Sequence, residues 1–270
     1  MTLEQLAKKY NIEVSELENI LKQISKTPKV TGADFRHYYG NKIRLGIMSD
    51  THIGSKEFDD EFFKYMCAMF DKQKVDGVYH AGDILEGMSG RDGHIYELNE
   101  IGFNNQINKA EKLFKRIKSP IYGINGNHDD WYAGKNNGGV DVGIELAKRV
   151  KNYHHLGSME ADIDLGHKVK LKLFHPNDGT AYATSYKLQK LIESLSGGDK
   201  PNILIEGHYH KALYMFNRNV HGFEAGTLAG QTKFMRGKKI AANKGFWILD
   251  VSIGKEGIGK IVPTFYPGYK

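Results

Sequence analysis

The sequence contains little of what marks several specialised classes of protein. Its 270 residues include one cysteine, Cys67, and six prolines. A single cysteine cannot form a disulfide within the chain, so a disulfide-stabilised fold is excluded and a reducing compartment, the cytoplasm, is predicted. No apolar run approaches the roughly 18–20 residues that span a bilayer, so we expect no membrane partner. The first ten residues, MTLEQLAKKY, lack the apolar segment of a signal peptide.

The rest of the composition is that of a globular protein with an excess of positive charge. Hydrophobic residues make up 40% of the chain, and its length suits one large domain with a small appendage. The net charge is +6, and seven basic residues but only one acidic residue lie between Lys211 and Lys244. This segment is either a solvated, lysine-rich hairpin or a surface that attracts phosphate groups. Cys67 lies in the apolar string FFKYMCAMF, which predicts a core position for it.

The N-terminal region predicts a helical appendage at residues 1–28, followed by a polar linker at 29–42. Apolar residues recur at helical spacing from Leu3 to Tyr10 and again over 17–24. The string LAKKYNIEVSELENIL resembles half of a helix-turn-helix. The appendage is therefore either a DNA-binding accessory or a hairpin that packs on the main domain.

From residue 43 to residue 270, strands and helices alternate in a way that predicts one α/β domain. Buried-strand patterns end at Asp50 and Asp83, and a third ends where GNHDD, residues 126–130, begins. Helices are expected at 58–73, 104–117, 142–150 and 185–195, and further strands at 161–176 as a hairpin, 201–210 and 245–266. Parallel β-α-β units followed by antiparallel strands predict a layered domain with mixed sheets.

Several of these strands end in residues of the kinds that bind metal ions. In chain order the fragments are Asp50-Thr51-His52, Gly82-Asp83, Asn127-His128-Asp129, His175 and His208-Tyr209-His210. Ligand sites of open α/β sheets lie beyond the carboxyl ends of parallel strands, so we expect these fragments to meet in one crevice. Each fragment alone is usually a turn or a cap, but five in order at predicted strand ends favour a functional site.

The fragments supply seven candidate metal ligands: Asp50, His52, Asp83, Asn127, His175, His208 and His210. Carboxylate, imidazole and amide groups without a thiolate suit Mn²⁺, Fe²⁺, Zn²⁺ or Ni²⁺, of which we expect Mn²⁺. Seven ligands are too many for one tetrahedral site but suit two divalent ions that share a carboxylate. Such a pair can hold a hydroxide and stabilise both oxygens of a displacement at phosphorus. His128 is left to protonate the leaving oxygen or to brace the developing charge.

This set of motifs, D-x-H, G-D, G-N-H-D, a lone His and G-H-x-H, resembles the calcineurin-like metallophosphoesterase superfamily over about residues 43–250. The resemblance implies a four-layer αββα sandwich of two mixed sheets with a binuclear centre. It implies that one ion takes Asp50, His52, Asp83 and His210, and the other Asp83, Asn127, His175 and His208. It also implies that His128 is the catalytic histidine, paired with a carboxylate that could be Asp129.

At two places the sequence departs from the motifs of particular branches of the superfamily, which narrows the choice of branch. The strings GDILEGM and GNHDD lack the arginine that Ser/Thr phosphatases of the superfamily carry in GDxxDRG. Glu86 stands where purple acid phosphatases have a tyrosine ligand. The strings that remain are similar to those of DNA-repair exonucleases and of the small, exonuclease-bearing subunit of archaeal polymerase D.

Three features favour nucleic acid or a nucleotide as the substrate, namely the helical appendage and two groups of candidate contacts. The basic segment begins directly after His210, and the loop SGRDGHIYELN follows the second motif. The basic segment supplies Lys211, Lys233 and Arg236, and the loop supplies Arg91 and His94. We therefore predict a phosphodiesterase of nuclease or exonuclease type. The alternatives are a phosphoesterase of small molecules, such as nucleotides or cyclic nucleotides, and a non-catalytic, polymerase-associated subunit. The last ranks lowest because all seven candidate ligands are present.

Overall fold

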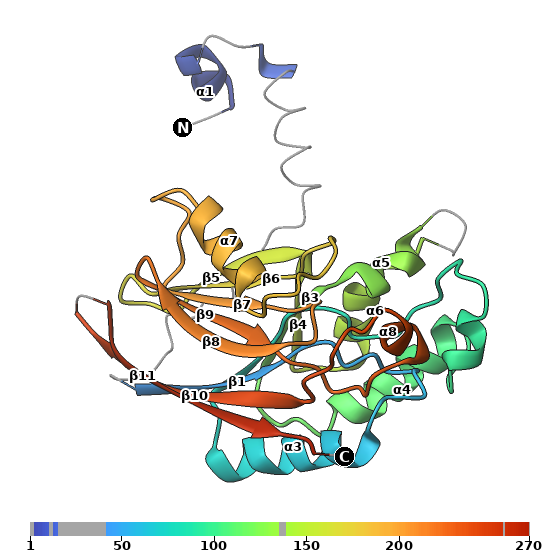
Figure 1. Ribbon diagram of the computed structural model, residues 1–270. Coiled ribbons are helices and arrows are strands. Elements are labelled where there is room, and N and C mark those ends of the chain that lie inside the picture. The colour runs from blue at the N-terminus through green and yellow to red at the C-terminus, as the bar shows by residue number, and fades with distance from the viewer. Residues whose placement is uncertain (1–2, 11–12, 16–41, 135–138, 256, 270) are drawn as a thin grey trace.

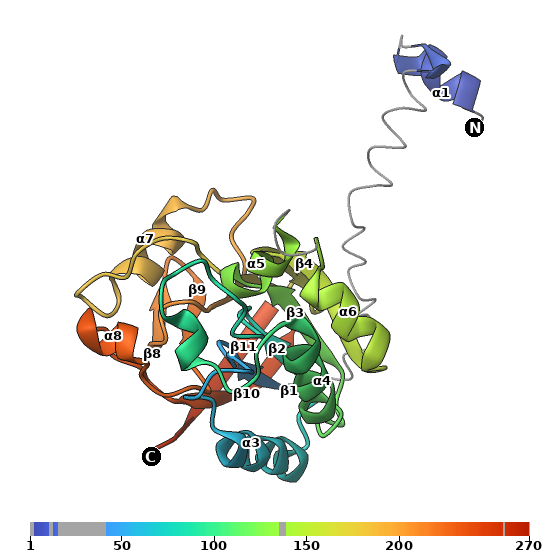
Figure 2. The ribbon, with the colours of Figure 1, turned by 90° about the vertical axis from the view of Figure 1, so that its right-hand side faces the viewer.

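The computed structural model describes residues 3–10, 13–15, 42–134, 139–255 and 257–269. Two β-sheets packed face to face form the main body, and helices cover their outer faces (Figures 1 and 2). One sheet has six strands in the order β11-β10-β1-β2-β3-β4, and the other has five in the order β5-β6-β7-β9-β8. The predicted four-layer αββα sandwich of two mixed sheets is therefore confirmed.

The six-stranded sheet carries the first three motifs. Its strands are β1 (Lys42–Met48), β2 (Gly77–His80), β3 (Ile121–Asn125), β4 (Tyr153–Ser158), β10 (Gly245–Gly254) and β11 (Gly257–Pro267). Strands β1 to β4 pair in parallel, whereas β10 pairs antiparallel with both β1 and β11. The outer face is covered by α3 (Asp60–Gln73), α4 (Phe103–Phe114) and α6 (Val142–Arg149). Phe63, Phe114 and Leu146 of these helices are buried against it.

The five-stranded sheet carries the remaining motifs. Its strands are β5 (Glu160–Asp164), β6 (Lys170–Phe174), β7 (Ile203–Glu206), β8 (Ala212–Asn217) and β9 (Val220–Ala225). Strands β6, β7 and β9 pair in parallel, and β5 and β8 form antiparallel edges. Helix α7 (Tyr186–Ser194) packs on the outer face through Leu188 and Ile192. Between the two sheets lies a buried apolar layer that includes Ile47, Tyr79, Leu173, Ile205 and Phe223.

Helix α3 illustrates how local sequence sets these elements. Its buried stripe is spaced as one helical face: Phe63, Met66, Cys67 and Phe70. Asp59 ends the preceding loop, because its side chain accepts a hydrogen bond of 2.9 Å from the backbone N–H of Phe62. The helix therefore begins two residues later than predicted. Cys67 is 7% exposed, which confirms its predicted core position.

The structure differs from the expected elements at five places. Strand β4 has no counterpart among the expected elements, and GNHDD is the start of a short helix, α5 (Asn127–Ala133), rather than only a turn. Strand β9 pairs in parallel with β7, although antiparallel pairing was expected throughout this region. The basic segment is not one hairpin, because the β8–β9 hairpin is followed by a short helix, α8 (Lys233–Gly237). The loop after β2 contains a 3₁₀ turn, η2 (His94–Glu97).

The N-terminal region is described only in part. Helix α1 (Leu3–Tyr10) matches the first predicted helix. The second predicted helix, over 17–24, lies outside the described residues, as does the predicted linker up to residue 41. The division into 1–28, 29–42 and 43–270 therefore stays a prediction. In the described part of the chain, no helix is long and apolar enough to cross a bilayer.

Candidate metal centre

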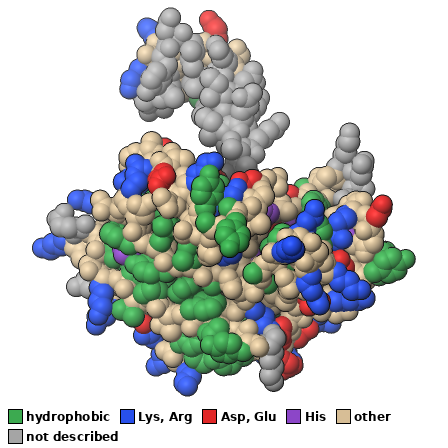
Figure 3. Space-filling model, in the orientation of Figure 1, with side chains coloured by type: hydrophobic (Ala, Val, Ile, Leu, Met, Phe, Trp, Pro, Cys, Tyr) green, Lys and Arg blue, Asp and Glu red, His purple; other side chains and the backbone are tan. Residues whose placement is uncertain are grey.

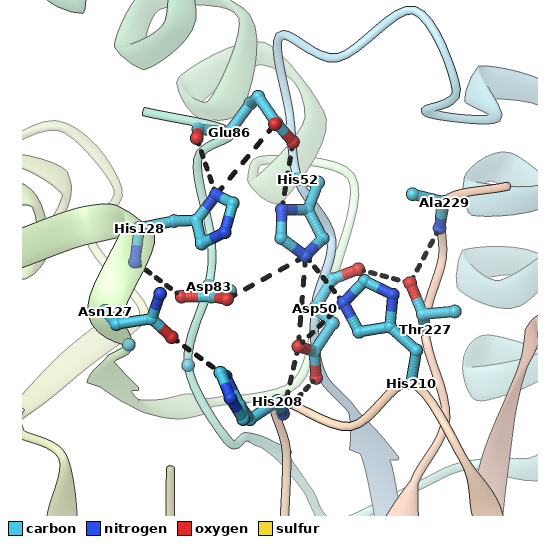
Figure 4. Close-up of polar contacts among 12 residues, drawn as sticks. Asp50, His52, Asp83, Glu86, Asn127, His128, His208, His210, Thr227 and Ala229 are labelled. Atoms are coloured by element: carbon cyan, nitrogen blue, oxygen red, sulfur yellow. Dashed lines mark hydrogen bonds and ion pairs between the residues drawn. The ribbon is translucent and has the colours of Figure 1, made fainter. Parts of the chain in front are cut away.

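The carboxyl ends of five strands from both sheets meet at one end of the sandwich. Asp50 and His52 follow β1, Asp83 follows β2, Asn127 follows β3, His175 follows β6, and His208 and His210 follow β7. The structure brings all seven of these side chains together (Figure 4 labels all but His175). The parallel strands of the two sheets thus direct residues up to 160 positions apart in the chain to one centre.

One group of ligand atoms surrounds Asp50. Nε2 of His210 lies 3.3 Å from Oδ1 of Asp50 and 2.9 Å from Nε2 of His52. Nε2 of His52 lies 3.8 Å from Oδ2 of Asp83. Two atoms that both contact one transition-metal ion at about 2.1 Å are roughly 3–3.5 Å apart. The two contacts of His210 are close to this spacing, and the contact between His52 and Asp83 is slightly longer. The group contains the four residues that the resemblance assigns to one ion.

A second group of candidate ligand atoms also borders Asp83. Nε2 of His175 lies 3.3 Å from Oδ2 of Asp83 and 3.1 Å from Oδ1 of Asn127. Nδ1 of His208 lies 2.9 Å from the same Asn127 oxygen. Asp83 therefore borders both groups, and its Oδ2 atom faces an imidazole of each. This is the position expected of a carboxylate shared by two ions.

The hydrogen bonds behind the imidazoles determine which nitrogen carries a lone pair. Nδ1 of His175 lies 2.7 Å from the carbonyl of Ala81, and Nε2 of His208 lies 2.8 Å from the carbonyl of Asp178. A carbonyl only accepts, so each of these nitrogens carries the proton and donates it. In the neutral ring, the opposite nitrogen then presents a lone pair to Asp83 and Asn127. Lone pairs and carboxylate oxygens converging on one point repel each other unless a cation lies between them, so this donor set fits a metal ion.

The buried carboxylates make the centre attractive to positive charge. Asp50 and Asp83 are 0% and 1% exposed. Burial alone would lower the pKa of His175, yet Asp83 and Asp50 beside it raise that pKa to about 9. Burial opposes the charge on His52 too, and Glu86, Asp83 and Asp50 raise its pKa to about 9. Protons and divalent cations therefore compete for the same imidazoles.

The backbone at the centre is unusual for residues that are not glycine. Five of the seven candidate ligands have a left-handed conformation: Asp50 (φ 49°), His52 (φ 47°), Asp83 (φ 55°), His208 (φ 75°) and His210 (φ 55°). Such conformations persist where surrounding hydrogen bonds determine them, and they gather at functional sites. Here the N–H of Asp50 donates to Gly82 O at 3.0 Å, and the N–H of His208 donates to Oδ1 of Asp50 at 3.0 Å.

Gly126, the first residue of GNHDD, allows the third motif to approach the second. A Cβ atom at this position would lie 2.2 Å from Oδ1 of Asp83 and 2.7 Å from Cε1 of His175. No side chain fits in that space. The glycine therefore lets Asn127 and His128 reach the centre from the start of α5.

His128 lies at the rim, beside the group around His52. Its Nδ1–H donates to the carbonyl of Glu86 at 2.8 Å, and its backbone N–H donates to Oδ1 of Asp83 at 2.9 Å. Its ring packs on Trp131 at 4.0 Å between centroids. Because Nδ1 is fixed as a donor to a carbonyl, Nε2 is the atom free to exchange a proton.

Asp129 occupies a different place from the one expected. Its carboxylate accepts hydrogen bonds from the backbone N–H groups of Ile84, Leu85 and Gly126 at 3.0, 2.9 and 2.9 Å. The expected pairing of His128 with Asp129 is corrected, because Nδ1 of His128 bonds to Glu86 instead. As the third residue of α5, Asp129 caps that helix and holds the loop that follows Asp83.

Glu86 is the functional residue that the motifs alone miss. Its Oε2 lies 3.0 Å from Nδ1 of His52, and its Oε1 lies 2.9 Å from Nε2 of His94. Burial would raise its pKa, but His52 and His94 hold that pKa well below its usual range, so the carboxylate is charged. The sequence offers one sign of this role: Glu86 stands three residues after Asp83, close to a candidate ligand. The motif comparison notes that position only because a tyrosine ligand is missing there.

The five candidate substrate contacts separate in the structure. His94 is 3% exposed, and because it bonds to Glu86 it supports the centre rather than facing solvent. Arg91 is exposed and pairs with Glu97 at 2.7 Å. Both line a cavity of 430 Å³ that opens over the candidate ligands. The other three, Lys211, Lys233 and Arg236, are not among the residues that line it.

Those three basic residues differ in the contacts that their side chains make within the protein. Nζ of Lys211 donates to the carbonyl of Ala181 at 2.8 Å, and Arg236 lies 3.6 Å from Glu57. Lys233 is exposed on α8. Lys233 and Arg236 both lie on α8, so a phosphate-attracting surface stays a prediction for the neighbourhood of that helix.

Three solved structures are similar to this chain over most of its length. Solved structures with a similar fold include a novel archaeal phosphodiesterase, 17% identical over 83% of this chain and 100% of that chain, with a TM-score of 0.49. The phosphoesterase Yfce from E. coli is 13% identical over 82% and 98%, with a TM-score of 0.42. Vps29 from Entamoeba histolytica, complexed with zinc, is 11% identical over 83% and 99%, with a TM-score of 0.42. At these identities the likeness concerns the fold alone.

The sequence itself matches a family model, whereas no curated protein matches it significantly. The model that describes the calcineurin-like phosphoesterase superfamily domain matches residues 43–251. This range includes all five motifs and both sheets except β11 and the end of β10. The chain therefore belongs to the calcineurin-like phosphoesterase superfamily, whose members are metal-dependent.

Proposed function

We propose that this protein is a phosphodiesterase of nuclease or exonuclease type that depends on two divalent metal ions and acts on nucleic acid. The observation that carries the proposal is the position of Asp83, whose Oδ2 atom faces His175 of one ligand group at 3.3 Å and His52 of the other at 3.8 Å. A carboxylate between two such groups is what a pair of ions needs.

The chain's own residues would hold the two ions as the resemblance implies. Asp50, His52, Asp83 and His210 would take one, and Asp83, Asn127, His175 and His208 the other. The mixed oxygen and nitrogen set suits Mn²⁺, with Fe²⁺, Zn²⁺ and Ni²⁺ as alternatives. When bound, the ions supply an activated water and neutralise the charge that develops on the phosphate.

The remaining polar groups position His52 and His128. The carboxylate of Glu86 holds the ring of His52, and its backbone carbonyl holds the ring of His128. Burial lowers the pKa of His128. An anionic phosphate beside the ring would offset that shift, so Nε2 would hold a proton where the leaving oxygen departs.

The surface near the centre supports a polyanionic substrate. Figure 3 shows Lys and Arg side chains on the side of the molecule where α8 lies. Four bases there are exposed: Lys233, Arg236, Lys238 and Lys239. A cluster of bases beside a phosphoester centre raises the local concentration of a phosphate chain.

A second candidate function is a phosphoesterase of small molecules. The 430 Å³ cavity over the candidate ligands favours it, because cavities of about 300–1,000 Å³ are typical of small-molecule sites. A nucleotide or a cyclic nucleotide would be the substrate in that case.

The proposal is tested with a panel of substrates in the presence of Mn²⁺. We expect hydrolysis of bis-p-nitrophenyl phosphate in preference to p-nitrophenyl phosphate, together with cleavage of single- or double-stranded DNA or RNA. The Asp83→Asn variant should lose this activity, and the exposed, distant Asp162→Asn serves as its matched control. Preference for the monoester without nucleic-acid cleavage would contradict the leading proposal, and full turnover by Asp83→Asn would contradict the shared carboxylate.

A further inference from the structure

The cavity over the metal centre has two chemically different walls. One is formed by the candidate metal ligands and His128. The other is largely apolar and comes from α5 and from the segment around α8: Trp131, Phe234, Met235 and Ile240. The two parts of the apolar wall, Trp131 and the segment around Phe234, lie more than 100 positions apart in the chain but line the same cavity.

A phosphate group alone would not bind to the apolar wall. Its charged oxygens would be held by the polar wall, and placing them against apolar side chains would leave them without hydrogen bonds. The apolar wall therefore matches a different part of the substrate, one that is itself apolar and attached to the phosphate.

The aromatic residues in this wall are held in place. The ring of Trp131 packs on His128 at 4.0 Å, and the guanidinium of Arg91 lies 5.0 Å from the centroid of Phe234. Arg91 is itself held by Glu97 at 2.7 Å. Met235 is 7% exposed and anchors α8, so Phe234 is presented from a fixed helix while remaining 44% exposed. Fixed, accessible rings bind planar aromatic groups with little loss of side-chain entropy.

The size of the cavity limits the ligand further. Its 430 Å³ is in the range of sites for single small molecules, whereas a double helix needs an open groove. A nucleotide combines a planar aromatic group with a phosphate in a molecule of this size.

We infer that the cavity binds one nucleotide unit, with its phosphate at the metal centre and its base against Phe234 on the apolar wall. This inference rests on the proposed function and specifies that the terminal nucleotide of a strand occupies the cavity; under the second candidate function the occupant is a free nucleotide. Phe234 is then a specificity-determining residue. Trp131 contributes to the same wall but also contacts His128, so Phe234 is the residue to vary.

The test compares two ligands that differ only by a base, adenosine 5′-monophosphate and ribose 5-phosphate. Binding of each to the full-length, Mn²⁺-loaded protein is measured by titration calorimetry. Base stacking on one aromatic side chain is worth about 1–3 kcal/mol, so the nucleotide should bind roughly tenfold more tightly. In Phe234→Ala this preference should disappear while the affinity for ribose 5-phosphate stays the same. Phe234→Tyr should retain the preference.

The matched control is Phe216→Ala, because Phe216 is 58% exposed on β8 and does not line the cavity. It should keep the preference for the nucleotide. Equal affinities of the wild type for the two ligands, or an unchanged preference in Phe234→Ala, would overturn the inference alone. Failure of ribose 5-phosphate to bind, together with no hydrolysis of bis-p-nitrophenyl phosphate, would overturn the proposed function and the inference with it.

Discussion

Replacing Glu86 by glutamine tests whether the metal centre depends on a carboxylate that is not itself a ligand. Each of its two oxygens faces a different imidazole, at 3.0 Å from His52 and 2.9 Å from His94. A glutamine has the same shape but only one acceptor oxygen, so its NH₂ group must face one of the two rings. One ring then loses its carboxylate partner and turns or changes tautomer.

Two effects of Glu86→Gln on Mn²⁺ affinity oppose each other. Loss of the group that orients a metal-binding histidine typically weakens metal affinity about 10–100-fold. Removing the charge of Glu86 also lowers the pKa of His52 from about 9, which relieves competition by protons. At about pH 8.5 that competition amounts to only about fourfold, so the loss of orientation dominates there. We expect Mn²⁺ to bind Glu86→Gln about tenfold more weakly at that pH.

The measurement is a calorimetric titration of metal-free protein with Mn²⁺, followed by turnover at increasing Mn²⁺ concentration. Excess Mn²⁺ should restore most of the turnover, because the ligands themselves are unchanged. Glu160→Gln is the control, because Glu160 is exposed on strand β5 and pairs with Lys172. Equal Mn²⁺ affinity in Glu86→Gln and the wild type would refute the role given to Glu86.

Three further predictions address other parts of the molecule. His128→Ala should leave the metal content, measured by elemental analysis, unchanged and lower kcat by about 10²–10⁴-fold, as expected for a lost proton donor; loss of metal would instead make His128 a ligand. Glu224 is 1% exposed, and neither of its carboxylate oxygens has a hydrogen-bond partner among the described residues; burial raises its pKa to about 7, partly offset by Lys211. The folded state therefore keeps a proton that the unfolded chain releases above its ordinary pKa of 4.5, so stability falls as pH rises from there to about 7. Glu224→Gln should raise the melting temperature at pH 8 but not at pH 4, and an equal effect at both would contradict this pKa. If the four exposed bases near α8 contact a single strand, the logarithm of its affinity should fall with the logarithm of salt concentration with a slope of about −3, measured by fluorescence anisotropy; a slope near zero would remove these bases from the binding surface.

The candidate ligands were accessible to prediction because they depend on local sequence. Asp50 and Asp83 end apolar runs, and the side chains beyond the carboxyl ends of parallel strands converge for geometric reasons. The seven candidate ligands were predicted without knowledge of how the two sheets pack.

Contacts made across the fold could not be predicted in the same way. Glu86 is separated from His52 by 34 positions, and Asp129 accepts hydrogen bonds from a loop 44 positions away. Nothing in the sequence around Asp129 distinguishes a cap that holds this loop from a partner of the neighbouring His128. Strand β4, with the sequence YHHLGS, lacks clear alternation of apolar and polar residues, and its strand character comes from pairing with β3.

The left-handed backbone at five of the candidate ligands lowers the stability of the fold at positions whose side chains the proposed activity needs. A residue other than glycine in this conformation costs about 1–2 kcal/mol, so five together approach the total stability of about 5–15 kcal/mol that is typical of a protein. Glycine would relieve this cost at each position but would remove the ligand. Selection of random variants for thermal stability in a chelator should therefore enrich glycine at these positions, whereas selection for turnover should keep aspartate and histidine there.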